Sequence, residues 1–194
     1  IMGIVVAKTK TRFGRYRPWI LTGTILNAVV LYALFAVPSG MADTKMRVWL
    51  TVFYLAWGVS YTLMDIPYWS MIPAITRPGS DRDQLSSLAR ACAGIGDALP
   101  TVLTMVIVPI LSGSSVIADY RIGFKYWALI VAIVFVVSEL VCVLNVPEKK
   151  IEDVETVGIG QMFKSLFKND QAMAVVLAVI MVYTALNIVA NLIL

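Results

Sequence analysis

Apolar runs of about twenty residues, separated by short charged clusters, constrain this sequence more than any other feature. An α-helix needs roughly twenty apolar residues to cross the hydrocarbon core of a bilayer. Only 14% of the residues are charged, against about 25% in a typical soluble domain, so the chain lacks the surface of a water-soluble fold. We therefore predict an all-α, polytopic membrane helical bundle. Its five spans lie at approximately 18–37, 48–75, 85–111, 125–146 and 171–194, after the tail of an earlier span at 1–7.

The positive charges predict which ends of these spans face the cytoplasm. Segments 8–17, 76–84 and 147–170 together carry eleven Lys and Arg residues, whereas the opposite connections carry four. Cytoplasmic loops are enriched in Lys and Arg, so we expect these three segments in the cytoplasm. Because the charges gather between the apolar runs, a nucleic-acid partner is not expected.

Segment 147–170 is the one long connection, and it suggests a division of the chain. Its second part, 159–168, has helical apolar spacing, which favours a helix at the inner membrane surface, although a plain linker also fits. We predict an N-terminal bundle at 1–146, a cytoplasmic middle loop at 147–170 and the first helix of a C-terminal bundle at 171–194. Because both ends fall in apolar runs, we expect a fragment of a longer carrier.

The reactive side chains do not indicate an enzyme. The sequence contains no His, and its two cysteines, Cys92 and Cys142, lie inside apolar runs without metal-ligand spacing. The spans also lack a nucleophile beside a base, so we predict no catalytic residues, no cofactor and no metal site beyond a transported cation.

One carboxylate inside the second predicted span is the strongest candidate for a functional site. Tyr61, Asp65 and Trp69 are spaced four residues apart and share one helical face, with Thr62 on its adjoining edge. An ionisable group at the bilayer centre costs about 2.5–3.5 kcal/mol or more. An aromatic ring beside a carboxylate can stack on a sugar ring and accept hydrogen bonds from its hydroxyls, so this face predicts a sugar site.

Three further charged residues lie inside the predicted spans. Arg90 lies at a depth similar to that of Asp65, which favours pairing with Asp65 or a sugar held by both, with snorkelling to the headgroups as the alternative. Asp97 either lines the cavity or pairs with a helix outside this sequence. For Glu139, near the inner end of its span, snorkelling or a cytoplasmic salt bridge is favoured over substrate contact.

Several segments resemble one transporter family. Residues 61–70 (YTLMDIPYWS) closely resemble the fourth helix of the melibiose permease-like branch of the glycoside–pentoside–hexuronide cation symporters, within the major facilitator superfamily. Residues 11–19 (TRFGRYRPW), 82–85 (RDQL) followed by Arg90, and 168–171 (KNDQ) match the same family in order and spacing. The resemblance covers nearly the whole chain and implies the end of helix two to the start of helix seven of a twelve-helix carrier.

The resemblance also implies roles for individual residues. It implies galactoside binding by Asp65, Trp69 and Arg90, with Tyr61 lining the same cavity. It further implies a cation site at Thr62 and a role for Arg82 in cytoplasmic gating. The resemblance places the family's main cation carboxylates on helix two, before Ile1. At the position of Asp97 the melibiose permease-like branch is expected to have a small residue, so Asp97 takes no role from the resemblance.

These implications predict a secondary active transporter that imports a sugar or glycoside by alternating access. The expected substrate is an α-galactoside such as melibiose, and the expected coupling cation is Na+ or H+. The expected partners are therefore the sugar, a monovalent cation and the lipid bilayer. The alternatives are a hexuronide, xyloside or oligosaccharide carrier of the same family, or an inactive assembly fragment of such a carrier.

Overall fold

The predicted all-α architecture is confirmed. A computed structural model describes residues 2–9, 11–38, 40–113, 120–146 and 159–193, and within these ranges it contains helices and a single isolated bridge, Thr11 to Gly14, but no strand. The helices in chain order are α1 (Met2–Lys8), α2 (Arg17–Phe35), α3 (Asp43–Ile75), α4 (Ser80–Ser112), α5 (Arg121–Asn145), α6 (Ile159–Lys168) and α7 (Asp170–Ile193).

The helix boundaries follow the local chemistry of the sequence. α2 begins at Arg17 with Pro18 in its first turn, where the missing N–H of proline is harmless. α2 ends at Phe35, before the Pro38-Ser39-Gly40 break. Pro67 and Pro73 lie inside α3, and Pro100 and Pro109 lie inside α4, which membrane helices tolerate because neighbouring groups can satisfy the freed carbonyls.

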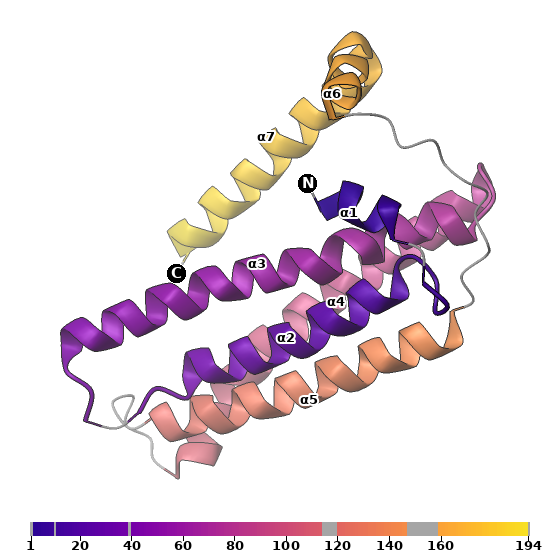
Figure 1. The fold of residues 1–194 in the computed structure, drawn as a ribbon. Helices are drawn as coiled ribbons and strands as arrows, with labels where there is room; N and C mark the ends of the chain where they lie inside the picture. Colours follow the sequence, from indigo (N-terminus) through magenta and orange to yellow (C-terminus); the bar gives the residue numbers. More distant parts are fainter. Residues whose placement is uncertain (1, 10, 39, 114–119, 147–158, 194) are drawn as a thin grey trace. The chain divides into compact units, whose positions relative to one another are not determined.

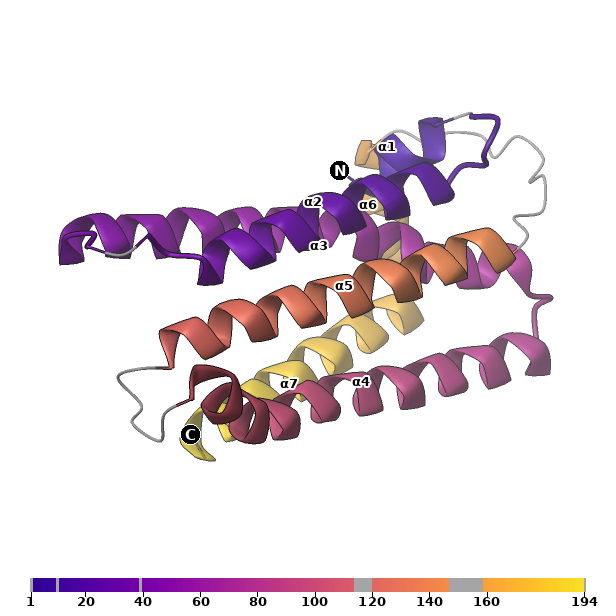
Figure 2. The same cartoon turned by 90° about the horizontal axis from the view of Figure 1, so that it is seen from below.

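The chain divides into two compact units, Ile1–Glu152 and Asp153–Leu194. The first unit contains α1 to α5, and the second contains α6 and α7, which contact each other. In the first unit α2 lies between α3 and α5, and α4 packs against α5 (Figures 1 and 2). α1 contacts α3, and α4 also meets α3 where a short turn joins them.

The interface between α2 and α3 is close and partly polar. A Cβ atom added at Gly23 of α2 would lie 2.8 Å from the backbone nitrogen of Met64 and 2.9 Å from its Cβ, so only glycine permits this approach. One turn further, the buried Asn27 amide donates to Ser60 Oγ at 2.9 Å and to the Trp57 carbonyl at 3.1 Å. Small residues and interhelical hydrogen bonds are the usual means by which membrane helices associate.

The antiparallel pair α2 and α5 is joined at both ends by arginines. Arg17, the first residue of α2, donates to the carbonyl of Val146 just beyond α5. Arg121, the first residue of α5, donates to the carbonyl of Val37 just beyond α2. Carbonyls at a helix C-terminus lack intrahelical partners and attract positive charge, so each arginine satisfies the end of the other helix.

One end of the first unit holds its apolar cluster, which consists of the buried Ile20, Met71 and Val143. These residues come from the start of α2 and the ends of α3 and α5. Segments 11–16 and 76–79 therefore lie at this same end, as the charge pattern predicts. That this end faces the cytoplasm stays a prediction.

Three of the predicted spans are helices long and apolar enough to cross a membrane: Arg17–Phe35, Ser80–Ser112 and Arg121–Asn145. α3 is also long, but its Trp, Tyr, Thr and Asp residues lower its mean hydropathy. The apolar part of α7 is shorter and comprises Asp170–Ala185. The helix predicted at 159–168 is present as α6. Its place at the membrane surface stays a prediction, and residues 147–158 of the middle loop lie outside the described residues.

Replacing Gly23 with Ala should destabilise the protein. The added methyl group would overlap Met64, and overpacking costs typically about 1–3 kcal/mol. Gly58→Ala is the matched control, because no atom lies within 4 Å of the added methyl group and alanine is the better helix former. Thermal unfolding in detergent should give a lower Tm for Gly23→Ala and an equal or higher Tm for Gly58→Ala. Equal Tm values for Gly23→Ala and the unmodified protein would contradict the close approach.

Candidate functional site

The predicted sugar-site face is present on α3, and its carboxylate and indole are bonded to each other. Asp65 and Trp69 are one helical turn apart, and the Trp69 indole N–H donates to Asp65 Oδ1 at 3.0 Å. Both side chains are half-buried. Because Trp offers only this one donor, the hydrogen bond fixes how the ring lies against the carboxylate.

Arg90 of α4 joins the same group from the neighbouring helix. Its Cζ atom lies 4.3 Å from the centroid of the Trp69 ring, which is a cation–π contact worth about 0.5–2 kcal/mol depending on solvation. The structure thus links the two predicted charges, Asp65 and Arg90, through the indole that lies against both. These three residues, Asp65, Trp69 and Arg90, are called the indole triad below.

The indole triad combines the groups that a polyhydroxylated ring requires. A carboxylate accepts hydrogen bonds from hydroxyl groups, a guanidinium donates them in a planar fork, and an indole face stacks on apolar C–H groups. The carboxylate of Asp65 lies at the N–H edge of the indole and the guanidinium of Arg90 lies over its face, so the two opposite charges leave the site with little net charge. This chemistry suits a neutral sugar better than an ion.

Tyr61 and Thr62 lie one turn before Asp65 on α3. Tyr61 is exposed, and its ring centroid lies 5.9 Å from that of Trp57. The Thr62 hydroxyl donates to the Gly58 carbonyl at 2.9 Å, and its oxygen keeps lone pairs that can accept or coordinate. The residues that the structure describes contain no group of three or more His, Cys, Asp or Glu residues that could hold a metal ion.

Arg82 ties the start of α4 to the end of α3. Its guanidinium donates to the Pro73 carbonyl at 3.3 Å and, through Nε, to Thr76 Oγ1 at 3.5 Å. Pro73 and Thr76 stand at the end of α3, next to the turn that leads into α4. Arg82 is therefore placed to influence how these two helices meet, which is the region that the family resemblance associates with gating.

Two further carboxylates, Asp97 and Glu139, lie in the predicted spans. Asp97 is exposed on α4. Glu139 of α5 is half-buried, and its Oε2 atom is buried without a hydrogen-bond partner in the described chain. That Glu139 snorkels or forms a cytoplasmic salt bridge stays a prediction.

An aromatic row on α3 extends beyond the residues that the sequence analysis singled out. Side chains spaced four residues apart form a ridge inclined to the helix axis. On α3 this ridge comprises Lys45, Trp49, Phe53, Trp57, Tyr61, Asp65 and Trp69. The spacing of four was visible in the sequence, so the first members of the row could have been predicted from the same signal.

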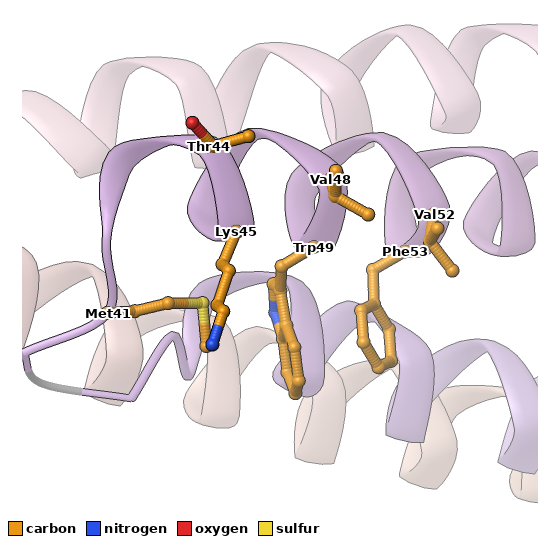
Figure 3. Close-up of a pocket in the computed structure, with 7 residues that line it drawn as sticks. All are labelled: Met41, Thr44, Lys45, Val48, Trp49, Val52 and Phe53. Carbon is orange, nitrogen blue, oxygen red and sulfur yellow. The ribbon is translucent and has the colours of Figure 1, made fainter.

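A shallow pocket lies at the far end of this row, away from the indole triad. Its volume is about 360 Å³, and Lys45, Trp49 and Phe53 point to the same side of α3 within it (Figure 3). The Trp49 and Phe53 ring centroids are 4.4 Å apart, and the Trp49 N–H donates to the Ala33 carbonyl of α2 at 3.0 Å. Thr44 and Lys45 contribute to the lining, but the surface that the pocket exposes is almost wholly apolar, which does not suit a sugar.

The buried pair Asn27 and Ser60 was not predicted either. Asn27 is one of few strongly polar residues in the apolar run 18–37, and this isolation was the available signal. Its hydrogen bonds to α3 end at Ser60, the residue directly before Tyr61, and at Trp57, one turn earlier. The pair therefore fixes the part of α3 that leads into the candidate site.

Known proteins similar to this chain are sugar carriers. The family described as MFS/sugar transport protein matches residues 1–194. The raffinose carrier protein of Pediococcus pentosaceus is 29% identical over 200 residues, which cover 98% of this chain and 31% of the relative. The lactose permease of Lactobacillus delbrueckii subsp. bulgaricus is 32% identical over 178 residues, which cover 88% and 28%.

The isoprimeverose transporter of Lactiplantibacillus pentosus is 27% identical over 169 residues, which cover 86% of this chain and 35% of the relative. The chain thus spans about a third of the length of these curated relatives. The match along the full sequence and the helical fold confirm the resemblance to sugar symporters and the multi-pass membrane character. The chain belongs to the MFS/sugar transport protein family, whose members are transporters rather than enzymes.

Proposed function

We propose that this chain forms part of a bacterial cytoplasmic-membrane symporter that imports a sugar or glycoside together with Na+ or H+. The observation that carries the proposal is the indole triad, in which one ring lies against both a carboxylate and a guanidinium. In this proposal Trp69 stacks on the sugar ring, Asp65 accepts hydrogen bonds from its hydroxyls, and Arg90 donates to its oxygens. Tyr61 lines the same side of α3.

The mechanism is alternating access. The cation binds with help from the Thr62 hydroxyl, one turn from Asp65, and favours the sugar-binding arrangement of α3. Coupling requires that cation and sugar increase each other's affinity by the same factor. The loaded helices then change between outward-facing and inward-facing states, and Arg82 governs the contact between the inner ends of α3 and α4.

An α-galactoside is the proposed substrate. Two similar proteins are named for raffinose and for lactose, sugars that both contain a galactosyl unit, and another is named for isoprimeverose. Binding of a labelled α-galactoside to the full-length carrier in membranes, with competing xyloside, hexuronide and oligosaccharide, identifies the substrate class. Galactoside binding displaced by none of the other sugars supports the proposal, whereas stronger binding of a xyloside or a hexuronide favours that alternative.

Asp65→Asn should weaken sugar binding in the full-length carrier by roughly tenfold to a hundredfold. The amide still accepts from the Trp69 N–H, but the charged acceptor is lost, and hydrogen bonds to charged groups contribute about 1.5–3 kcal/mol each. Isothermal titration with the sugar measures the change. Asp43→Asn, at the exposed first turn of the same helix, is the control and should bind normally. An unchanged Kd for Asp65→Asn, in a folded protein, would remove Asp65 from the site.

Two substitutions of Trp69 separate stacking from hydrogen bonding. Trp69→Phe keeps a smaller aromatic face and loses the N–H that donates to Asp65, so it should retain part of the sugar affinity. Trp69→Ala loses both contacts and should bind more weakly than Trp69→Phe. Trp49→Phe, in the apolar pocket at the other end of the row, serves as the control. Equal affinities for all three variants would contradict stacking on Trp69.

Arg82→Met should slow transport more than it weakens sugar binding. The substitution removes the hydrogen bonds to Pro73 and Thr76 but keeps an unbranched side chain. Arg77→Met, at an exposed position of the same connection, is the matched control. Uptake rates and equilibrium binding are measured on the same vesicles. A normal uptake rate for Arg82→Met would count against a gate between α3 and α4.

A further inference from the structure

Glu139 is the buried titratable group that the proposed mechanism leaves unused. It lies on α5 one turn before Val143, a member of the apolar cluster with Ile20 and Met71. Its Oε2 atom is buried and has no hydrogen-bond partner in the residues that the structure describes. A carboxyl oxygen in this position needs an explanation, because buried polar atoms in native proteins are normally bonded.

The groups around Glu139 do not neutralise a negative charge. Tyr68 of α3 and Cys142 of α5 lie within electrostatic reach of the carboxyl group, and Cys92 of α4 lies within reach of Tyr68. From α2, Tyr16 packs against the apolar cluster. Arg17, at the start of α2, is a further charged group. Its guanidinium donates to the carbonyl of Val146, which lies two helical turns beyond Glu139.

An ionised carboxylate is therefore unfavourable in this packing. Transfer of an unpaired charge into an apolar environment is far more costly than transfer of a neutral polar group, and charged side chains in membrane spans are costly in general. The neutral acid fits among apolar residues and a tyrosine. The ionised form is stabilised by contact with water, and Oε2 is shielded from water in the structure.

Tyr68 connects this carboxyl group to the indole triad. Its ring packs against the apolar cluster on one side and meets the Trp69 ring edge-on, with centroids 5.5 Å apart and planes at 86°. Trp69 in turn donates a hydrogen bond to Asp65 and makes a cation–π contact with Arg90. A change in packing around Glu139 can thus reach Trp69 through a single intervening side chain.

We propose that Glu139 is a proton-binding site of the carrier and that its protonation is transmitted through Tyr68 to the sugar-binding indole. The carboxylate takes one proton from water when the cluster closes and returns it to water when the cluster opens, so charge and atoms balance. The effect on sugar rests on the proposed function of the indole triad. A proton is the ligand that fits, since a sodium ion would need several oxygen ligands, and the part of the chain that the structure describes has no group of three or more His, Cys, Asp or Glu residues that could hold a metal ion.

The sign of the pH dependence follows from linkage. The closed cluster binds the proton more tightly than the open one, so lowering the pH favours closure. If closure holds Trp69 in its sugar-binding position, sugar affinity rises as pH falls. Coupling between two sites typically changes the affinity at each by about fivefold or more. We therefore expect the Kd for sugar to differ by at least about fivefold between the low-pH and the high-pH limits.

Infrared difference spectroscopy of the full-length carrier tests protonation directly and needs no sugar. The unmodified protein should show the carbonyl stretch of a protonated carboxylic acid that disappears as pH is raised. Glu139→Gln should lack this band, whereas Asp97→Asn, which changes an exposed carboxylate on α4, should retain it. Absence of the band from the unmodified protein, or its persistence in Glu139→Gln, overturns the proton site.

Titration of sugar binding against pH tests the connection to the indole triad. Glu139→Gln mimics the neutral acid and should bind sugar with the low-pH affinity at every pH, and Asp97→Asn should keep the pH dependence of the unmodified protein. Tyr68→Phe keeps the ring and should preserve much of the coupling. A pH dependence in Glu139→Gln equal to that of the unmodified protein overturns the connection. Failure of the unmodified carrier to bind any sugar would instead contradict the proposed function and leave the infrared result to decide the proton site.

Discussion

The close approach of α2 to its two neighbours is the constraint on which the first unit depends. α2 meets α3 at Gly23, where a single added carbon would overlap Met64, and one turn later Asn27 bonds to Ser60. Among lipid chains the hydrophobic effect does not hold helices together, so close packing and interhelical hydrogen bonds must do so. Because α3 carries Asp65 and Trp69, the position of these two members of the indole triad depends on how α2 packs against Ser60 and Met64 of the same helix.

The indole triad places two costly charges where each is partly compensated. Asp65 accepts a hydrogen bond from Trp69, and Arg90 lies over the face of the same ring. The hydrogen bond and the cation–π contact are each worth about 0.5–3 kcal/mol, which is within the range of contacts that a bound ligand can replace. Glu139 differs, because its buried oxygen has no such compensation in the described chain. One region of the protein thus holds a charge pair suited to hydroxyl groups and a separate acid suited to a proton.

Much of the fold could be predicted from the sequence, since apolar runs and prolines report directly on helix length and breaks. The run 18–37 became α2, and the face of Tyr61, Asp65 and Trp69 follows from helical spacing alone. What could not be predicted depends on contacts between helices. No local sequence pattern predicts that Arg90 stacks on Trp69 or that Asn27 bonds to Ser60. Nor does one predict that the buried Oε2 atom of Glu139 has no hydrogen-bond partner in the described residues. The family resemblance supplied roles for residues, but not these distances.

The reciprocal arginines of α2 and α5 make the lengths of these two helices interdependent. Each arginine starts one helix and reaches a carbonyl just beyond the end of the other. Inserting one residue into either helix would move its end by about 1.5 Å and turn it by about 100°, which would displace a carbonyl from its arginine. Changes in sequence length during evolution should therefore accumulate in the connections and be excluded from α2 and α5. The arginine contacts at both ends therefore require α2 and α5 to keep matching lengths.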